Sequence, residues 1–580
     1  MKRIISVILI LTILLISIFS TVSCNIFTPD TDNNQSVGGD NQNGGQNTEG
    51  EESGGNGQQG NKPEDNNPED NNPEDNNPED NNPEDNNPED NKPEDDNKED
   101  EHSCDKTGHT DSNADDYCDE CNTYVAVIID FYVINDLHGK FCDTDSQGGV
   151  DELATYLKNA RETDDNSIFL ATGDMWQGTA ESNLTRGNIL TEWMNELDFT
   201  AMTMGNHDFD WGVEAIKNNA DMAEFPFLAI NVYDLSTGRL ADYCTPSVMV
   251  ECDGIQVGII GAIGDCYSSI SSDKVKNVEF KVGDELAALV EAEADRLRAE
   301  GADLIVYSLH DGHGKSSSGK KTISNSDLKK YYTPSLSNGV VDIVFEAHTH
   351  QNYTLVDSYG VYHIQAGGEN KGISHVELSV NTVNGNNKVR VADYVRSTMY
   401  TSLEDDPSTE ALEEKYADII EMSYSTLGTV SRYYDDDVLE NKVAELYLEY
   451  GLEEWGKQYN IVLGGGFLRT RSPYNLSSGN TTYADILSLL PFDNDIVLCS
   501  VKGYKLKSQF VQTSNGDYHI AYSDYGEDLI EQISDYETYY IVVDTYTALY
   551  SYNGLTIVDY LDSGLYARDL VAEAIRNGEL

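Results

Sequence analysis

Short apolar runs alternate with helix-like stretches between residues 124 and 400 of this chain. The runs YVAVIIDFYVI, SIFLA, DLIVYSL and VDIVFEA are almost continuously apolar, which is typical of strands buried on both faces. Between them, segments such as VGDELAALVEAEADRLRAEG repeat Ala, Leu and Val at helical spacing and end at a glycine. Strands that alternate with helices indicate an α/β fold.

The pattern changes near Asp406. The segment DDPSTEALEEKYADIIEMSY places Asp406 at a predicted helix N-cap and Pro407 in the first turn, and its apolar residues form one stripe. We interpret residues 401–424 as a linker helix. It would join a first domain, residues 124–400, to a smaller second domain, residues 425–580, that is rich in tyrosine.

The N-terminal segment, residues 1–24, reads MKRIISVILILTILLISIFSTVSC. Its basic start, its apolar run and the small residues that follow predict a secretory signal, which is too short for a comfortable membrane span. TVSC resembles a bacterial lipobox, with cleavage before Cys24 and lipid on its sulfur; ordinary signal cleavage nearby is the alternative. Lipidation would hold the mature chain on the extracellular face of the cell membrane, and we expect no other membrane contact.

Residues 25–103 contain very few apolar side chains. Proline recurs there at five-residue intervals, each time followed by Glu-Asp, and no position of this repeat could be buried. We predict a disordered, acidic, low-complexity tether between the anchor and the folded domains.

The charge balance narrows the possible partners. The 580-residue chain has 37 Lys and Arg against 103 Asp and Glu, for a formal net charge of −66 at pH 7. Such a surface argues against nucleic-acid binding, which needs a basic stripe. It also repels anionic substrates, so a phosphate site here would need its own positive charge, and bound metal dications are the obvious source.

Residues 104–123 form a small Cys/His knuckle, with the sequence CDKTGHTDSNADDYCDECNT. Four side chains match the composition of a tetrahedral structural zinc site: Cys104, His109, Cys118 and Cys121. A disulfide pair is an equal alternative. The acidic residues between them also follow the spacing of a calcium loop, but Asp116 and Asn122 fit its sixth and twelfth positions poorly.

Five turns rich in metal-ligand side chains each follow a predicted strand. They read INDLHG, ATGDMWQG, GNHDFDWG, YSLHDGHG and FEAHTHQ. Sites in open α/β sheets gather at the carboxyl ends of strands, so we expect these turns to meet. Seven side chains suit two divalent metal ions: Asp136, His138, Asp174, Asn206, His310, His348 and His350.

The seven residues divide into two sets that share the Asp174 carboxylate. One ion would take Asp136, His138, Asp174 and His350, and the other would take Asp174, Asn206, His310 and His348. His313 is a rival to His310. We prefer His310 because it follows directly from the strand, whereas the Gly-flanked loop of His313 predicts a surface position.

The order of these turns resembles the calcineurin-like metallophosphoesterase superfamily, whose pattern is D-x-H, GD, GNH[DE], H and GH-x-H. NDLHG, GDMWQG and GNHDFDWG are particularly similar to the secreted 5′-nucleotidase family, which includes UDP-sugar hydrolases and cyclic-nucleotide phosphodiesterases. The resemblance runs from about Tyr124 to the C-terminus. It implies a four-layer α/β/β/α sandwich followed by a smaller α+β domain. It departs at EAHTHQ, where Glu346-Ala347 replaces a usual glycine.

The second domain carries its own resemblance to this family. LGGGFLRTR is similar to N-G-G-x-x-R, and TTYADILSLLPFDNDIVLCSVKGYKLK matches the segment around LPF-x-N. The match implies that Phe492 stacks on a nucleobase, that Arg469 contacts phosphate or ribose, and that Tyr546 is a second stacking ring. Hydrophobic core is the alternative for both rings. Gly464 in place of Asn, Asp435 in place of Arg and a missing Gly-Gly-Asp-Gly affect nucleotide specificity rather than the phosphatase residues.

These features predict metal-assisted hydrolysis of a phosphate ester with two divalent ions, Zn²⁺, Mn²⁺ or similar. We expect His207 to serve the leaving group as a proton or hydrogen-bond donor, oriented by Asp210, and not to bind metal. The leading hypothesis is a monomeric, lipid-anchored extracellular enzyme that converts nucleoside 5′-phosphates to nucleoside and phosphate. A 2′,3′-cyclic-nucleotide phosphodiesterase or UDP-sugar pyrophosphatase is the alternative. A catalytically inactive surface binding module is the third reading, and the complete ligand set argues against it.

Overall fold

The computed structural model describes residues 104, 108–143, 149–164, 167–313, 340–357, 359–466, 475–508, 519–523, 529–551, 554–560 and 565–580. The predictions for the signal segment, Cys24, the tether and Arg469 lie outside these residues. Within them, none of the helices combines the length and the apolar character that crossing a membrane requires.

Two six-stranded sheets form the first domain. The first sheet has the order β15-β14-β1-β2-β3-β4 and the second has the order β12-β13-β11-β10-β8-β7. The strands of the first sheet are β1 (Val127–Ile134), β2 (Ile168–Ala171), β3 (Ala201–Thr203), β4 (Phe227–Leu228), β14 (Gly372–Asn381) and β15 (Asn386–Arg396). Those of the second sheet are β7 (Ser247–Cys252), β8 (Ile255–Ile263), β10 (Leu304–His310), β11 (Ile343–Glu346), β12 (Asn352–Val356) and β13 (Tyr362–Ala366).

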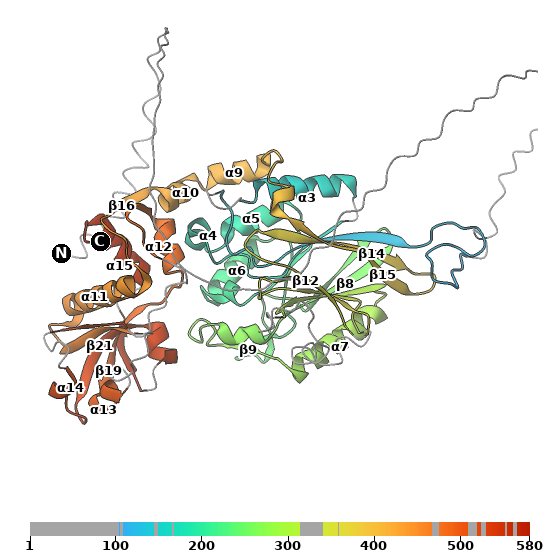
Figure 1. Ribbon diagram of the computed structural model, residues 1–580. Coiled ribbons are helices and arrows are strands. Elements are labelled where there is room, and N and C mark those ends of the chain that lie inside the picture. The colour runs from blue at the N-terminus through green and yellow to red at the C-terminus, as the bar shows by residue number, and fades with distance from the viewer. Residues whose placement is uncertain are drawn as a thin grey trace, which may run out of the picture. The chain divides into compact units, whose positions relative to one another are not determined.

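The apolar runs become strands because both of their faces are covered. Phe131 of β1 and Phe345 of β11 meet between the sheets, with ring centroids 5.6 Å apart, in a core shared by the two inner faces. Helices α3 (Asp151–Thr163) and α5 (Asn188–Glu196) cover the outer face of the first sheet, and α7 (Asp284–Ala299) covers the second (Figure 1). The expected four-layer α/β/β/α arrangement is confirmed.

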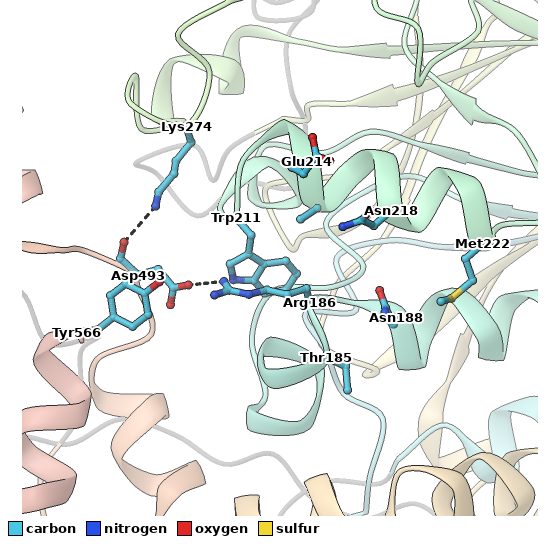
Figure 2. Close-up of a pocket in the computed structure, with 11 residues that line it drawn as sticks. Thr185, Arg186, Asn188, Trp211, Glu214, Asn218, Met222, Lys274, Asp493 and Tyr566 are labelled. Carbon is cyan, nitrogen blue, oxygen red and sulfur yellow. Dashed lines mark hydrogen bonds and ion pairs between the residues drawn. The ribbon is translucent and has the colours of Figure 1, made fainter. Parts of the chain in front are cut away.

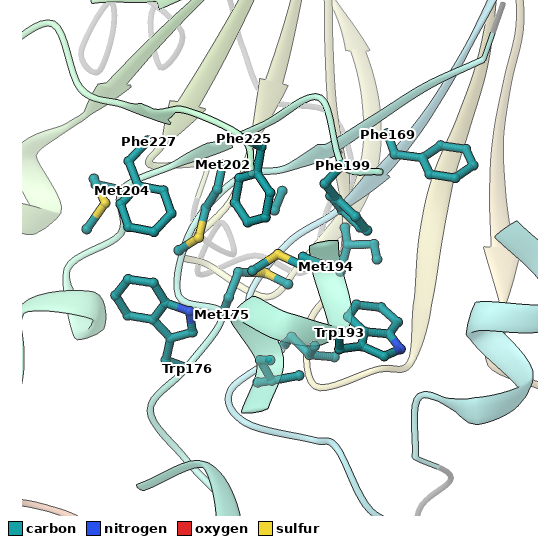
Figure 3. Packing of buried hydrophobic residues seen from close by; sticks show 14 of the residues in the cluster. Phe169, Met175, Trp176, Trp193, Met194, Phe199, Met202, Met204, Phe225 and Phe227 are labelled. Carbon is teal, nitrogen blue, oxygen red and sulfur yellow. The ribbon is translucent and has the colours of Figure 1, made fainter. Parts of the chain in front are cut away.

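A second core lies between the first sheet and its helices. Figure 3 shows the aromatic and methionine side chains that fill it, including Trp176, Trp193, Met202 and Phe227. Trp176 is fully buried and packs 5.4 Å from the Phe227 ring. Because Met175 and Trp176 directly follow Asp174, this core fixes the turn that carries the central carboxylate of the site.

The predicted linker helix is two shorter helices, α9 (Pro407–Lys415) and α10 (Ala417–Tyr424), which meet at Tyr416. Asp406 is the N-cap of α9 as predicted, since its carboxylate accepts hydrogen bonds from the backbone amides of Ser408 and Thr409. Lys158 of α3 also donates to this carboxylate at 2.8 Å, which fastens the start of the linker to the first domain.

The second domain is built on a five-stranded sheet of order β20-β17-β21-β19-β22. Helix α11 (Asp436–Trp455) packs on it, and Asp435, which stands where the family has arginine, is the N-cap of this helix. The strands are β17 (Ile461–Gly466), β19 (Ile496–Lys502), β20 (His519–Tyr522), β21 (Thr538–Asp544) and β22 (Thr556–Tyr560). Beside them are α12 (Tyr483–Leu489), α15 (Ala567–Arg576), and the pair β16 (Thr426–Val430) and β18 (Gly479–Thr482).

Candidate active site

The seven candidate metal ligands come together where β1, β2, β3, β10 and β11 end. His138 Nε2 lies 3.0 Å from His350 Nε2, although the two residues come from turns after strands of different sheets. His310 Nε2 lies 3.2 Å from both the Asp174 Oδ2 and the Asn206 Oδ1 atoms. Two sheets therefore contribute to one site, as parallel strands that end at a common edge allow.

The donor atoms fit a divalent metal. Three groups have ligand atoms within 4.8 Å of one another: Asp136, His138 and His350; Asp136, Asp174 and His310; Cys266, His310 and His348. Imidazole nitrogen and carboxylate oxygen are the donors that first-row divalent ions favour, and imidazole nitrogens 3.0 Å apart face a common point. Cys266 has no counterpart in the motifs and was missed by the sequence reading. Burial raises the pKa of its thiol, which keeps it protonated without a metal.

Five of the candidate ligands hold a left-handed backbone conformation. The φ angles are 49° at Asp136, 51° at His138, 54° at Asp174, 66° at His348 and 51° at His350. Non-glycine residues rarely adopt this region, and each such residue costs on the order of 1–3 kcal/mol. Strain concentrated on these five residues indicates a fold that holds their side chains in place for function.

Backbone carbonyls orient two of the imidazole rings. His138 Nδ1 donates to the Gln177 carbonyl at 2.9 Å, and His310 Nδ1 donates to the Thr172 carbonyl at 2.6 Å. In each ring the Nε2 atom is thereby directed to the site, as is usual for metal-binding histidines. Burial lowers the pKa of His138 to about 4, so its Nε2 keeps a lone pair at neutral pH.

Asp174 and the histidines around it shift one another's pKa values. Burial opposes its ionisation, but the charges of His310 and His207 hold the pKa of its carboxyl well below the usual range. In return, Asp174 raises the pKa of His310 to about 10 against the opposing effect of burial. A carboxylate that stays ionised at any physiological pH suits the role of a shared ligand.

Asp208 holds the turn of Asp174 in place through hydrogen bonds to the backbone. The sequence analysis assigned it no role. Its buried carboxylate accepts hydrogen bonds from the backbone amides of Asp174, Met175 and Gly205 at 2.8–3.2 Å. The GNHDFD segment thus contains two acids with different surroundings, and only Asp208 braces the turn. The motif signals the residue but not its partners Asp174 and Met175, which lie more than 30 residues away along the chain.

His207 and Asp210 form the expected pair beside the metal-ligand cluster. His207 Nδ1 lies 2.9 Å from Asp210 Oδ2, and the ring is about a quarter exposed. Burial raises the pKa of the Asp210 carboxyl, an effect that the His207 charge opposes. The Phe492 ring stacks next to His207, with centroids 6.3 Å apart and planes at 21°.

His313 is not at the surface, so that expectation is wrong. It is 1% exposed, and its Nδ1 lies 2.8 Å from the Glu346 Oε2 atom. The second oxygen of Glu346 pairs with His363 Nδ1 at 2.7 Å, and Tyr353 also donates to this carboxylate. Glu346, which lies in the Glu346-Ala347 departure from the motif, therefore anchors a buried polar network under the turn of His348.

Asp493, which directly follows Phe492 in the chain, forms a charged cluster with two arginines. The buried Asp493 carboxylate pairs with Arg186 and with Arg568, and Lys274 donates to its carbonyl at 3.4 Å. Figure 2 shows Arg186, Lys274 and Asp493 at one end of a cavity of about 420 Å³, with Trp211 near Arg186. The two arginines hold the pKa of Asp493 below its usual range against the effect of burial.

Both predicted stacking rings are partly exposed to solvent. Phe492 is 42% exposed and Tyr546 is 39% exposed, so neither ring is hydrophobic core. Exposed rings are available to a ligand, although exposure alone assigns none.

Comparisons with known proteins agree with this geometry. Residues 129–352 match the model of the calcineurin-like phosphoesterase family. The chain is 26% identical over 423 residues to an apyrase of Tabanus yao, covering 65% of this chain and 72% of the relative. It is 24% identical to the protein UshA of Yersinia enterocolitica over 66% of this chain and 75% of the relative. The fold resembles the crystal structure of a 5′-nucleotidase precursor from Thermus thermophilus, with a TM-score of 0.55 at 19% identity, covering 78% and 96% of the chains.

Proposed function

We propose that this chain, which carries a calcineurin-like metallophosphoesterase domain and is a metal-dependent phosphoric ester hydrolase, removes phosphate from nucleoside 5′-phosphates. The observation that carries the proposal is the convergence of Asp136, Asp174 and His310 with the His207–Asp210 pair at one edge of two sheets. Asp136, Asp174 and His310 would help to hold divalent ions, which when bound would supply a water of lowered pKa and positive charge against the phosphate oxygens.

The seven ligands and the pair have separate roles in this proposal. The residues that would hold the ions are Asp136, His138, Asp174, Asn206, His310, His348 and His350, with Asp174 as the ligand common to both proposed sets. His207 stands at the rim of this set, and Asp210 accepts a hydrogen bond from its Nδ1 atom at 2.9 Å. The Nε2 atom of His207 would donate to the oxygen that leaves with the nucleoside.

The nucleoside part of the substrate would be held by an aromatic face. Phe492 supports this assignment because its exposed ring stacks next to His207, the residue that serves the leaving group. A base on Phe492 would thus lie on the leaving-group side of the phosphate. Tyr546 is proposed as a second stacking ring and Arg469 as a phosphate or ribose contact.

A substrate panel with metal add-back tests the activity. The purified chain is stripped with chelator and supplied with Zn²⁺ or Mn²⁺, and phosphate release is measured from AMP, 2′,3′-cyclic AMP, UDP-glucose and p-nitrophenyl phosphate. We expect metal-dependent turnover with AMP preferred. Preference for cyclic AMP or UDP-glucose would replace the nucleotidase assignment by the corresponding alternative. No turnover of any ester in metal-replete protein would contradict the hydrolase assignment itself.

A single variant separates nucleoside recognition from chemistry. Phe492→Ala is expected to raise KM for AMP about 10-fold, since base–aromatic stacking contributes about 1–3 kcal/mol. Turnover of p-nitrophenyl phosphate, which has no base, should change less than 2-fold. Equal losses on both esters would argue that Phe492 acts through structure and not through a nucleobase.

We also propose that the mature chain is held outside the cell by lipid on Cys24. The signal-like residues 1–24 and the polar segment that follows support this location. Cys24→Ser should move the protein from the membrane fraction to the medium or soluble fraction, with unchanged activity per molecule. Membrane retention of the variant would argue against the anchor.

A further inference from the structure

A second cluster of metal-ligand side chains lies outside the active site. We call it the Cys₃His quartet, and its members are Cys104, His109, Cys118 and Cys121. All four ligand atoms lie within 4.8 Å of one another, and the three cysteines are free thiols. The Cys104 and Cys118 side chains are 1% and 2% exposed, so two of the four ligand groups are shielded from solvent.

The spacing inside the quartet is that of a tetrahedral metal site. With zinc–sulfur distances of about 2.3 Å and zinc–nitrogen distances of about 2.0–2.1 Å, a tetrahedron has S···S edges of about 3.8 Å and S···N edges of about 3.5 Å. The Sγ atoms of Cys104 and Cys118 are 3.6 Å apart, and Cys121 Sγ is 3.5 Å from His109 Nδ1. A disulfide requires about 2.05 Å between sulfurs. We propose that the quartet binds one structural Zn²⁺ ion.

The backbone around the quartet is fixed by short hydrogen bonds. The Cys118 amide donates to Thr123 O at 2.8 Å, and the Cys118 carbonyl accepts from the Asn122 amide at 2.8 Å, which closes the Cys-x-x-Cys turn. Asn122 has a φ of 58°, the left-handed conformation that such a tight turn needs. Both sulfurs of the turn are therefore held on the same side, facing His109.

The Asp111 carboxylate of this segment serves as a hydrogen-bond acceptor within the fold and not as a calcium ligand. The Asp111 carboxylate accepts from the backbone amides of Asp115 and Asp116, and from the Asn381 side chain at 2.7 Å. The Asn384 amide adds a further hydrogen bond to it at 3.0 Å. Because N–H groups already donate to the Asp111 oxygens, these oxygens do not point to a cation position shared with the other acids.

These contacts dock the quartet on the first sheet. The Asp116 carboxylate lies 3.2 Å from Nζ of Lys388 in β15 and accepts from Ser379 and Asn381 of β14. Figure 1 shows residues 108–126 beside the β14–β15 end of the domain. The proposed zinc would thus stabilise residues 108–126, which we call the cap and which are fastened to the β14–β15 hairpin.

The cap and the active site lie at opposite ends of β1. Val127 at the start of β1 pairs with Val380 next to the cap, whereas Asp136 follows the other end of the strand. Eight residues at about 3.3 Å each separate the two ends by on the order of 25 Å. Loss of the cap should therefore leave phosphate-ester hydrolysis intact, which makes activity a control for folding.

Thiol-specific zinc release tests the proposal without any variant. The full mature chain is purified under reducing conditions with zinc, and p-hydroxymercuribenzoate is added in the presence of a chromogenic zinc chelator. We expect release of one zinc per chain, because the mercurial displaces the thiolate ligands of the quartet, whereas the seven side chains proposed to hold the active-site ions are carboxylate, amide and imidazole groups and do not include the buried Cys266 thiol beside them. No release from zinc-replete protein, or non-reducing peptide maps that show a disulfide within the quartet, would overturn the proposal.

A pair of variants then assigns the released ion. Cys121→Ser should lose the released zinc and become cleavable by protease within residues 104–123, while its turnover of p-nitrophenyl phosphate stays within 2-fold. Cys252→Ser, which replaces a buried free thiol of β7, is the matched control and should release zinc like the wild type. Undiminished release from Cys121→Ser would place the thiolate-bound zinc elsewhere and contradict the assignment.

Discussion

The backbone amide of Asp174 donates a hydrogen bond to the carboxylate of Asp208 at 3.0 Å. The same carboxylate oxygen accepts from Gly205 N at 2.8 Å, and Asp174 Oδ1 accepts from His207 N at 2.7 Å. The turns after β2 and β3 are thus tied to each other in both directions. The residue proposed to be shared between two ions is thus held through its backbone by the carboxylate of Asp208, which is outside the proposed ligand sets.

Asp208→Ala should therefore weaken metal binding without removing a ligand. Three buried amides lose their acceptor, and loss of such outer contacts typically lowers metal affinity or activity 10–100-fold. Metal titration of chelator-stripped protein by calorimetry measures the effect. Asp221→Ala, on the exposed side of α6 (Val213–Met222), is the control and should bind metal like the wild type.

His207→Asn should lower kcat by about 10²–10⁴-fold because it removes the proposed donor to the leaving group. KM and metal content should change little, since His207 is outside the proposed ligand sets. Steady-state kinetics with elemental analysis of the same sample measures both. Loss of metal from this variant would mean that His207 is a ligand and that the proposed division of roles is wrong.

Glu346→Ala should destabilise the first domain by about 3–5 kcal/mol, because it removes the buried carboxylate that pairs with the His313 and His363 rings and leaves Asp357 alone to face the His363 charge. The pKa of His363 is raised to about 9 by Asp357 and Glu346 against the effect of burial, so the ring is charged at neutral pH. Urea unfolding measures the loss. Asp242→Ala breaks an exposed pair with Lys217 and should change the free energy of unfolding by less than about 1 kcal/mol.

Asp151 predicts a pH dependence of stability. Burial and the nearby Glu413 and Asp405 carboxylates raise the pKa of Asp151 to about 7. The unfolded value is about 3.9, so the folded state binds the proton more tightly. The resulting stability is complete below about pH 4 and is lost as pH rises through about 7.

Asp151→Asn removes this titration and should flatten the dependence. As the pH rises from 5 to 9, the free energy of unfolding of the variant should increase relative to that of the wild type by on the order of 1–2 kcal/mol. This corresponds to about 2–4 °C in Tm. Thermal unfolding at several pH values measures the difference. Asp295→Asn, exposed on α7, should follow the wild-type curve, and a parallel curve for Asp151→Asn would contradict the assignment.

The alternation of strands and helices was readable from the sequence because buried parallel strands are apolar on both faces. The turns at Asp136, Asp174 and His348 were readable for a related reason. Each places ligand-type residues directly after such a strand, and strand ends of one sheet edge must meet. Local pattern therefore predicts the positions of the candidate ligands.

The supporting contacts were not readable, because they join segments that no local pattern connects. Nothing near Asp208 indicates that its carboxylate accepts the Asp174 amide, and His313 was assigned to the surface because glycines flank it. Its partner, Glu346, lies 33 residues away and looked like a mere departure from a motif. The break between α9 and α10 at Tyr416 was missed because one apolar stripe continues across both helices.

The left-handed conformation of five candidate ligands has a consequence for how the enzyme acquires its cations. A nascent or unfolded polypeptide rarely visits that conformation at even one of these positions, so it offers no preformed chelate to scavenge ions on the way. The cage exists only after both sheets have come together. Cations at this site are therefore bound late in folding, after the sheets of β1 and β11 have packed against each other.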